Sequence, residues 1–282
     1  MKQFLKPVLI LIGIIIIASV ISKVLNKSET LTEYAARDKA THSAESTELS
    51  TELQPETSNE QEATTTSPTA ESNTVTDTAS TNEETVDVTL SFYYEPLSDE
   101  LINKITGISY VENENISLDD LRYVHILHYN FDSEAVEGEL ICNEAIAQDL
   151  LEIFYELYLA EYKIEKVRLI DEYDGNDTAS MEDNNTSCFN YRVVDGTTKL
   201  SKHAYGLAID INPFYNPYVV FQSDGSTYIS PKGSEAYTDR SSDFPYKIDE
   251  NDLCYKLFKE HGFTWGGDWN SCKDYQHFQK AK

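Results

Sequence analysis

Basic residues are scarce in this chain, which has 22 lysines and arginines against 49 aspartates and glutamates over 282 residues. Residues 1–27 hold four lysines, and residues 28–86 hold thirteen acids against two basic residues, so residues 87–282 keep a net charge of −20. Such a surface repels the phosphates of nucleic acids and the headgroups of anionic lipids. The charge therefore argues against nucleic-acid binding and for solubility outside the cell, and a weaker bias toward amine-bearing substrates stays open.

Cysteine is also rare, and all four cysteines lie in residues 87–282: Cys142, Cys188, Cys254 and Cys272. None of them has the Cys-x-x-Cys spacing of a zinc site built from thiolates, so the pattern argues against such a site. An even number of cysteines in an exported domain permits two disulfides, and the three possible pairings stay open.

The N-terminal apolar run, Pro7 to Ile21, lacks an Ala-x-Ala cleavage site and a cysteine that would carry a lipid. A signal-peptide core needs about 7–15 apolar residues and a membrane-spanning helix about 20. The run lies between these lengths and can be extended if Lys23 reaches the interface. We predict that residues 1–27 form an uncleaved signal anchor, a single-pass transmembrane helix in the cell membrane with the C-terminal domain extracellular. The alternative is a cleaved signal peptide and a secreted protein.

Aromatic residues are absent between Tyr34 and Val86, where Ser, Thr, Glu, Ala and Asn dominate and no periodicity persists. This composition buries too little apolar surface to offset the entropy cost of ordering the chain. We therefore predict that residues 28–86 form a disordered linker, with a root-mean-square span of about 40–45 Å or more. Such a linker would tether a membrane-anchored domain and let it reach outward.

Residues 87–282 are long enough to form one compact domain. Apolar spacing and capping residues predict helices over 98–107, 143–162 and 249–263, with Ser98 and Asn143 as N-caps. Extended segments are predicted over 86–97, 123–131, 163–171, 207–211 and 275–279, with a turn at Glu137-Gly138 and a polar loop over 172–188. Because these elements do not alternate as regular βαβ units, the predicted class is α+β, a small antiparallel sheet flanked by helices.

The segment "SKHAYGLAID" places His203 and Asp210 seven residues apart around a glycine. Asp210 lies inside an apolar run, where an unpaired carboxylate is costly to bury and a neighbouring cation removes that cost. His277 in "DYQHF" completes a set of three ligands, the number that proteins supply to catalytic zinc. These residues predict a shared metal site. The alternative for each residue alone is a hydrogen-bonded core histidine and an unrelated aspartate.

The same segments resemble the motifs of a known family. "SKHAYGLAID" fits Ser-x-His-x-x-Gly-x-Ala-x-Asp and "DYQHF" fits Asp-x-x-His, while "NNTSCFNYR", "DINPFYNPYV" and "WGGDW" extend the likeness from about Phe92 to Gln279. Together they are similar to the VanY-type zinc metallopeptidases, D-alanyl-D-alanine carboxypeptidases and L-alanyl-D-glutamate endopeptidases that cut bacterial cell-wall peptides. That family is grouped with lysostaphin-type peptidases and the hedgehog signalling domain, so the resemblance implies a hedgehog/DD-peptidase-like fold.

The resemblance also implies roles for individual residues. The implied zinc ligands are His203, Asp210 and His277. Asp274 matches the catalytic acid/base, which would take a proton from the attacking water and deliver one to the leaving amine. Because residues 274 and 277 would face opposite sides of a regular strand, a bulge or turn is expected between them. Arg192 matches an arginine that holds the substrate carboxylate or the developing oxyanion, with a surface ion pair as the alternative.

Further candidates surround these motifs. Ser201 is either a substrate contact or a turn cap. The loop before Arg192 offers four residues for the lining of a cleft: Asp177, Ser180, Met181 and Asn184. Trp269 is a cleft wall or a core residue, and Asp268 is a candidate partner of a ligand histidine. We expect structural roles for His125, His128 and His261. Cys188 and Cys272 lie beside the motifs but outside the family pattern.

The resemblance makes a D-alanyl-D-alanine carboxypeptidase acting on peptidoglycan stem peptides the leading hypothesis. An L-alanyl-D-glutamate endopeptidase is the nearest alternative, and a non-catalytic zinc-containing domain that binds the cell wall is the alternative from another class. A binding domain would have no need of Asp274, so its presence favours an enzyme. We expect a monomer whose partners are the stem peptide and, through the N-terminal helix, the membrane.

Overall fold

The computed structural model describes residues 88–281. The predicted signal anchor and the predicted linker both lie outside the described residues. Among residues 88–281, no helix is long and apolar enough to cross a membrane. The described residues show an α+β arrangement of small sheets and a few helices, as predicted.

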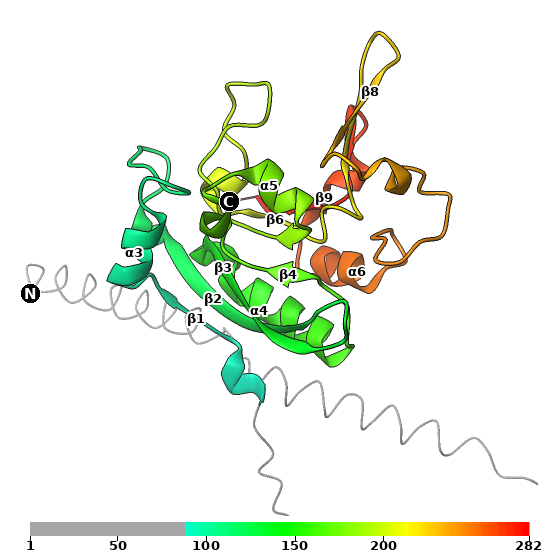
Figure 1. Cartoon of the computed structure of the whole chain (residues 1–282). Helices are drawn as coiled ribbons and strands as arrows, with labels where there is room; N and C mark the ends of the chain where they lie inside the picture. The colour runs from blue at the N-terminus through cyan, green and yellow to red at the C-terminus, as the bar shows by residue number, and fades with distance from the viewer. Residues whose placement is uncertain (1–87, 282) are drawn as a thin grey trace, which may run out of the picture. The chain divides into compact units, whose positions relative to one another are not determined.

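The first sheet contains three antiparallel strands in the order β1 (Tyr93–Pro96), β2 (Leu121–Tyr129) and β3 (Ala135–Asn143). Helix α4 (Glu144–Leu159) follows β3 directly and lies along one face of this sheet (Figure 1). The apolar residues whose spacing predicted this helix are buried: Ile146, Leu150, Ile153 and Leu157. As predicted, Asn143 caps α4, since its side chain accepts a hydrogen bond from the Ala145 N–H.

The segment before β2 is held by local capping. Residues 88–91 form a 3-10 turn, η1 (Val88–Ser91), so only the second half of the predicted extended opening is a strand. Helix α3 (Asp99–Ile105) begins after Ser98, whose side chain accepts from the Leu101 N–H, as predicted. A short turn, η2 (Leu118–Asp120), leads into β2.

Three local predictions between β2 and residue 188 were wrong. No turn occurs at Glu137-Gly138, because β3 runs through it; the side chains of Ile126 and Val167 fill the space that a Cβ on Gly138 would need. The predicted strand over 163–171 shortens to β4 (Lys166–Val167). Asp171 lies within the 3-10 turn η3 (Ile170–Tyr173) and accepts hydrogen bonds from the N–H and hydroxyl of Ser109.

The predicted polar loop over 172–188 contains two elements. Helix α5 (Asp177–Glu182) is capped by the side chain of Asn176, and β5 (Asn185–Thr186) pairs in parallel with β4. The turn η3 itself covers Ile170–Tyr173. The single helical turn of α5 is too short for apolar periodicity to reveal it, which explains the miss.

Two further antiparallel sheets build the C-terminal half. One has the order β6 (Ala208–Asp210), β11 (His277–Gln279) and β9 (Thr264–Trp265). The other has the order β10 (Cys272–Asp274), β7 (Tyr218–Phe221) and β8 (Thr227–Ser230), and its β7–β8 hairpin projects at the top of Figure 1.

The remaining short elements connect these sheets. Helix α6 (Leu253–Glu260) is capped by Asp252 and followed by Gly262, and it packs against α4 and β9. The 3-10 turns are η4 (His203–Tyr205), η5 (Glu235–Tyr237) and η6 (Gly266–Asp268). The predictions of the third helix and of strand β6 are confirmed, and the last strand begins two residues later than predicted.

Candidate functional site

His203 is the first residue of the short turn η4, and the residues of the segment "SKHAYG" form this turn. The Ser201 hydroxyl oxygen accepts a hydrogen bond from the His203 N–H at 3.2 Å, so this serine caps the turn. Gly206 ends the turn with φ at +64°, and a Cβ on it would lie 2.6 Å from the Asn143 nitrogen. Glycine therefore lets the turn approach the start of α4. There Asn143 donates from its backbone N–H to the Gly206 carbonyl and from its side chain to the Tyr205 carbonyl.

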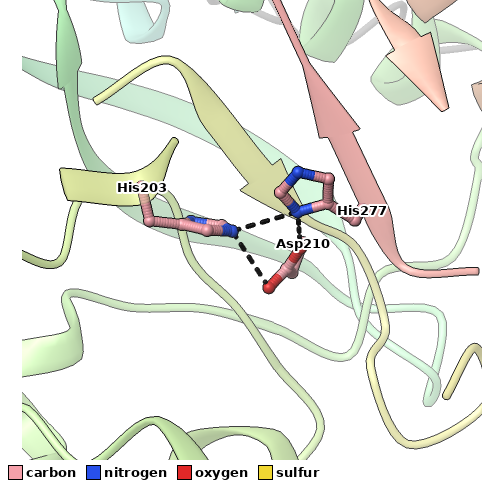
Figure 2. Close-up of side chains that lie close together, drawn as sticks. All are labelled: His203, Asp210 and His277. Atoms are coloured by element: carbon pink, nitrogen blue, oxygen red, sulfur yellow. Dashed lines mark hydrogen bonds and ion pairs between the residues drawn. The ribbon is translucent and has the colours of Figure 1, made fainter. Parts of the chain in front are cut away.

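Asp210 and His277 are brought together by strand pairing. Asp210 ends β6 and His277 begins β11, and the two residues are direct partners in the antiparallel register. The pairing closes a separation of 67 residues in the sequence. Figure 2 shows the result: the side chains of His203, Asp210 and His277 point toward one another.

The donor atoms of these three side chains converge closely. His277 Nδ1 lies 2.9 Å from Asp210 Oδ1, and His203 Nε2 lies 3.3 Å from Asp210 Oδ2. The two histidine nitrogens are 3.2 Å apart. One donor atom from each residue lies within 4.8 Å of the others, and all three residues are buried. The predicted metal-site residues thus form a buried group suited to a metal ion.

The outer ring nitrogens indicate which atoms face the site. His203 Nδ1 lies 2.5 Å from the Cys188 carbonyl oxygen, and His277 Nε2 lies 3.1 Å from Gln279 Oε1. Because both outer atoms face oxygen acceptors, each carries the ring proton in the neutral imidazole. His203 Nε2 and His277 Nδ1 then present bare lone pairs to each other and to a carboxylate. In that neutral form the two nitrogens and the carboxylate suit a metal ion, and this donor set matches that of zinc. Without a metal, a proton on His277 that faces Asp210 satisfies the same contact.

Electrostatics at the site also favour positive charge. Burial alone would raise the pKa of Asp210, but the charges and hydrogen bonds of His203 and His277 outweigh it and hold the pKa well below its usual range. Burial alone would lower the pKa of His277, but the hydrogen bond and charge of Asp210 outweigh it and raise the pKa to about 9. The carboxylate therefore stays ionised and attracts a cation.

These residues open onto a cleft with a volume of about 950 Å³, which Asp274 also lines. Asp274 ends β10, and Tyr275 and Gln276 separate it from β11, which belongs to a different sheet. The chain therefore leaves one sheet and enters another between Asp274 and His277, which agrees with the break predicted from their spacing. Gly266 packs on Asp274 so closely that a Cβ would lie 2.5 Å from the Asp274 carbonyl oxygen. The first glycine of "WGGDW", Gly266, therefore helps to place Asp274.

The Asp274 carboxyl has the properties of a proton-transfer group. Its Oδ1 atom is buried and has no hydrogen-bond partner among the described residues. Burial raises the pKa of Asp274; His277 opposes this shift and the charge of Asp210 adds to it, so that the pKa reaches about 7. A carboxyl with this pKa exists in both protonation states near neutral pH.

Arg192 lines the same cleft and is held by Asp177. Its Nη2 atom lies 2.7 Å from Asp177 Oδ2, while its Nε atom is buried without a partner among the described residues. Met181 also lines the cleft, as predicted, but Ser180 and Asn184 are not among its lining residues. Both are buried and engaged elsewhere, Ser180 with the Asn185 side chain and Asn184 with the Phe214 N–H.

Of the two tryptophans, Trp269 lines the cleft, with its ring centroid 5.3 Å from that of His277. Trp265 is a buried core residue that packs on Phe278 and Tyr255. The predicted role of Asp268 was wrong: it is exposed and pairs with Lys259, because η6 turns its side chain toward α6 and not toward a ligand histidine.

The other three histidines of residues 88–281 have contacts outside the metal group, whereas Cys188 contacts it through its backbone. His125 stacks on Tyr93, His128 faces the Ile164 carbonyl, and His261 contacts Asp149. All four cysteines are free thiols. Cys188 contributes its carbonyl oxygen to His203, and Cys272 lines the cleft.

Tyr218 and Gln276 are among the lining residues that the sequence analysis missed. Tyr218 is the register partner of Asp274 in the next strand, and Gln276 is a buried residue between Asp274 and His277. The position of Gln276 inside "DYQHF" was a usable signal. Nothing in the sequence indicated that β7 would pair with β10 and bring Tyr218 into the cleft.

Comparison with known families supports the motif analysis. Residues 195–280 match a family model described as D-alanyl-D-alanine carboxypeptidase. The matched segment contains His203, Asp210, Asp274 and His277, and the match supports the predicted resemblance to this family over that segment. Arg192 and Asp177 precede the matched segment. Neither the curated proteins nor the solved structures that were compared gave a match.

Proposed function

We propose that this D-alanyl-D-alanine carboxypeptidase-like peptidase is zinc-dependent and removes the terminal D-alanine from peptidoglycan stem peptides. The proposal depends on one observation: the ligand atoms of His203, Asp210 and His277 converge within 4.8 Å of one another at a cleft that Asp274 also lines. The family match to residues 195–280 gives the reaction class. The peptide bond and the metal are the parts that we propose.

His203 Nε2, His277 Nδ1 and the Asp210 carboxylate would hold the zinc ion. When bound, the ion would supply Lewis-acid polarisation of the scissile carbonyl and a lowered pKa for the attacking water. The protein's contribution is to fix the ring orientations through Cys188 and Gln279, so that both lone pairs face the same point. Burial of all three residues keeps bulk water from competing for the donor atoms.

Asp274 would transfer the protons of the reaction. As a carboxylate it accepts a proton from the attacking water, and as a carboxylic acid it delivers that proton to the nitrogen of the leaving D-alanine. The carboxyl group is then returned to its starting state. In the metal-free protein, burial raises the pKa of Asp274 to about 7, and the positive charge of a bound metal would favour the carboxylate form that accepts the first proton.

Arg192 would bind the negative charge of the substrate, either its terminal carboxylate or the developing oxyanion. Asp177 holds one side of the guanidinium, and the buried Nε donor has no partner among the described residues. Trp269 would form a wall beside His277, and Ser201 would act mainly by holding the turn that carries His203. A charged hydrogen bond to a carboxylate is stronger than a neutral one, so this arginine would favour a free C-terminus.

The cleft volume keeps the L-alanyl-D-glutamate endopeptidase as a second candidate. A volume of about 950 Å³ is near the upper end of the range for ligand pockets, about 300–1,000 Å³. A peptide that continues past the scissile bond would fit in such a space. A non-catalytic domain that binds the cell wall is less well supported, because it would have no use for the Asp274 carboxyl beside the candidate metal ligands.

We propose an extracellular location for the peptidase, with residues 1–27 as membrane anchor and residues 28–86 as linker. The apolar run and the flanking lysines of the first segment support this arrangement, as does the composition of the second. A net charge of −20 on residues 87–282 supports a domain that stays away from anionic lipid and nucleic acid. We propose that it acts as a monomer.

The test is to incubate the full-length chain with muropeptides and to identify the products by mass spectrometry. Loss of a single alanine from peptides that end in D-Ala-D-Ala is expected, and a chelator should abolish it until zinc is restored. Fragments that begin with D-glutamate would identify the endopeptidase instead. Intact peptides that nevertheless co-purify with the zinc-loaded protein would favour the binding domain.

A further inference from the structure

One wall of the cleft is a face of the sheet that carries Asp274. In the antiparallel register Asp274 lies opposite Tyr218 of β7, and Tyr218 lies opposite Ser230 of β8. Direct partners point to the same side of a sheet, and so do residues two positions apart in one strand. Cys272 and Tyr228 therefore share this face. All five residues line the cleft.

This wall extends the cleft well beyond Asp274. Neighbouring strands lie about 4.8 Å apart, so β8 is about 10 Å from β10, with β7 between them. A D-Ala-D-Ala unit spans at most about 7 Å, because an extended chain covers about 3.3–3.6 Å per residue. A dipeptide whose scissile bond lies at Asp274 is therefore too short to reach β8.

Tyr228 presents an aromatic ring at this far part of the wall, on the β7–β8 hairpin that projects in Figure 1. It is 42% exposed, and its ring centroid lies 6.5 Å from that of Tyr218 in an edge-on contact. Phe221 of the same hairpin is 57% exposed, but it pairs with Thr227 on the other face of the sheet and is not among the cleft-lining residues. Of these two exposed aromatic residues, Tyr228 is therefore the one that a molecule in the cleft can contact.

The proposed reaction determines which part of a substrate fills this space. A carboxypeptidase removes the last residue of a peptide, so a single residue lies on the carboxyl side of the scissile bond. Every other residue of the substrate lies on the amino side. Space about 10 Å from the strand of Asp274 therefore suits the residues that precede D-Ala-D-Ala.

We propose that Tyr228 is a specificity-determining residue that forms a subsite for the stem-peptide residues preceding D-Ala-D-Ala. This inference rests on the proposed function, because it takes a carboxypeptidase substrate as the occupant of the cleft. The exposed ring covers apolar parts of the bound chain and loses contact with water when the peptide binds. A peptide that ends before this subsite gains nothing from the ring.

The experiment compares four full-length enzymes on two substrates. Wild type, Tyr228→Ala, Tyr228→Phe and Phe221→Ala are tested on a stem pentapeptide that ends in D-Ala-D-Ala and on N-acetyl-D-Ala-D-Ala. Wild type should have the higher kcat/KM on the pentapeptide, and Tyr228→Ala should lower the ratio of the two values about tenfold, the order expected for one partly buried aromatic side chain. Tyr228→Phe keeps the ring and should keep the ratio. Phe221→Ala, the matched control on the other face, should also keep it.

The readouts separate the possible failures. Because each ratio compares two substrates on one enzyme, a partly unfolded variant does not change it. A wild type without preference for the pentapeptide, a ratio that Tyr228→Ala leaves unchanged, or an equal drop in Phe221→Ala would overturn the subsite. If wild type cleaves neither peptide, the proposed function fails; in that case, or if one peptide is too poor a substrate, the dissociation constants of both are measured by calorimetry. A loss of affinity by Tyr228→Ala that is confined to the pentapeptide would still support the subsite, and unchanged affinities would reject it.

Discussion

Replacing Asp274 by asparagine should separate proton transfer from metal binding, because Asp274 is not one of the three residues whose donor atoms converge. Asparagine keeps the size of the side chain but accepts no proton at neutral pH. We expect turnover of a D-Ala-D-Ala peptide to fall by about two to four orders of magnitude, the usual contribution of general acid–base catalysis. Zinc content should stay at the level of the wild type.

The same substitution should not weaken the fold. Burial raises the pKa of Asp274 from 3.8 to about 7, so the folded state keeps a proton that the unfolded chain has already lost. A carboxyl with a raised pKa destabilises the fold progressively as the pH rises from about 4 to about 7, and three pKa units correspond to roughly 4 kcal/mol. Asparagine has no such proton to lose. The metal-free variant should therefore match or exceed the wild-type Tm at pH 8, and the difference should vanish below pH 4.

Three measurements on the full-length chain test this reasoning: D-alanine release, zinc by atomic absorption, and Tm of the metal-free protein at both pH values. Asp268→Asn is a matched control, because Asp268 is an exposed aspartate of the neighbouring turn that pairs only with Lys259. This control should leave turnover and zinc content unchanged. Near-normal turnover by Asp274→Asn would refute the acid/base role, and loss of zinc would mean that Asp274 is a ligand.

Alanine at His203, Asp210 or His277 should each remove most of the zinc from the purified protein, because each takes away one of three donor atoms; stoichiometric zinc in all three variants would contradict the site. Arg192→Ala should raise KM or lower kcat on peptides with a free C-terminus and should matter less on amidated ones; equal cleavage of free and amidated peptides by wild type would instead favour the endopeptidase. Deleting residues 28–86 should leave activity on small soluble peptides unchanged; a drop would reveal a structural role for that segment.

The sequence by itself determined the features that depend on near neighbours. Ser98 and Asn143 cap their helices through hydrogen bonds to residues two or three positions ahead, and such short-range contacts are visible in a linear pattern. His203 and Asp210 could be identified as candidate metal ligands, because an unpaired aspartate in an apolar run is costly to bury and a neighbouring cation removes that cost. The family motifs extended this set to His277 and Asp274, and both residues lie in the matched segment, residues 195–280.

Tertiary structure decided what depends on strand register and on contacts across the chain. The pairing of β6 with β11 brings Asp210 beside His277, and the pairing of β7 with β10 brings Tyr218 beside Asp274. A register is set by the packing of whole sheets, and the spacing of single residues does not encode it. For the same reason the ion pair of Arg192 and the place of Tyr228 in the cleft wall were not visible in the sequence. Short segments of the sequence determine which side chains the site contains, but these side chains come together only when the strands pair.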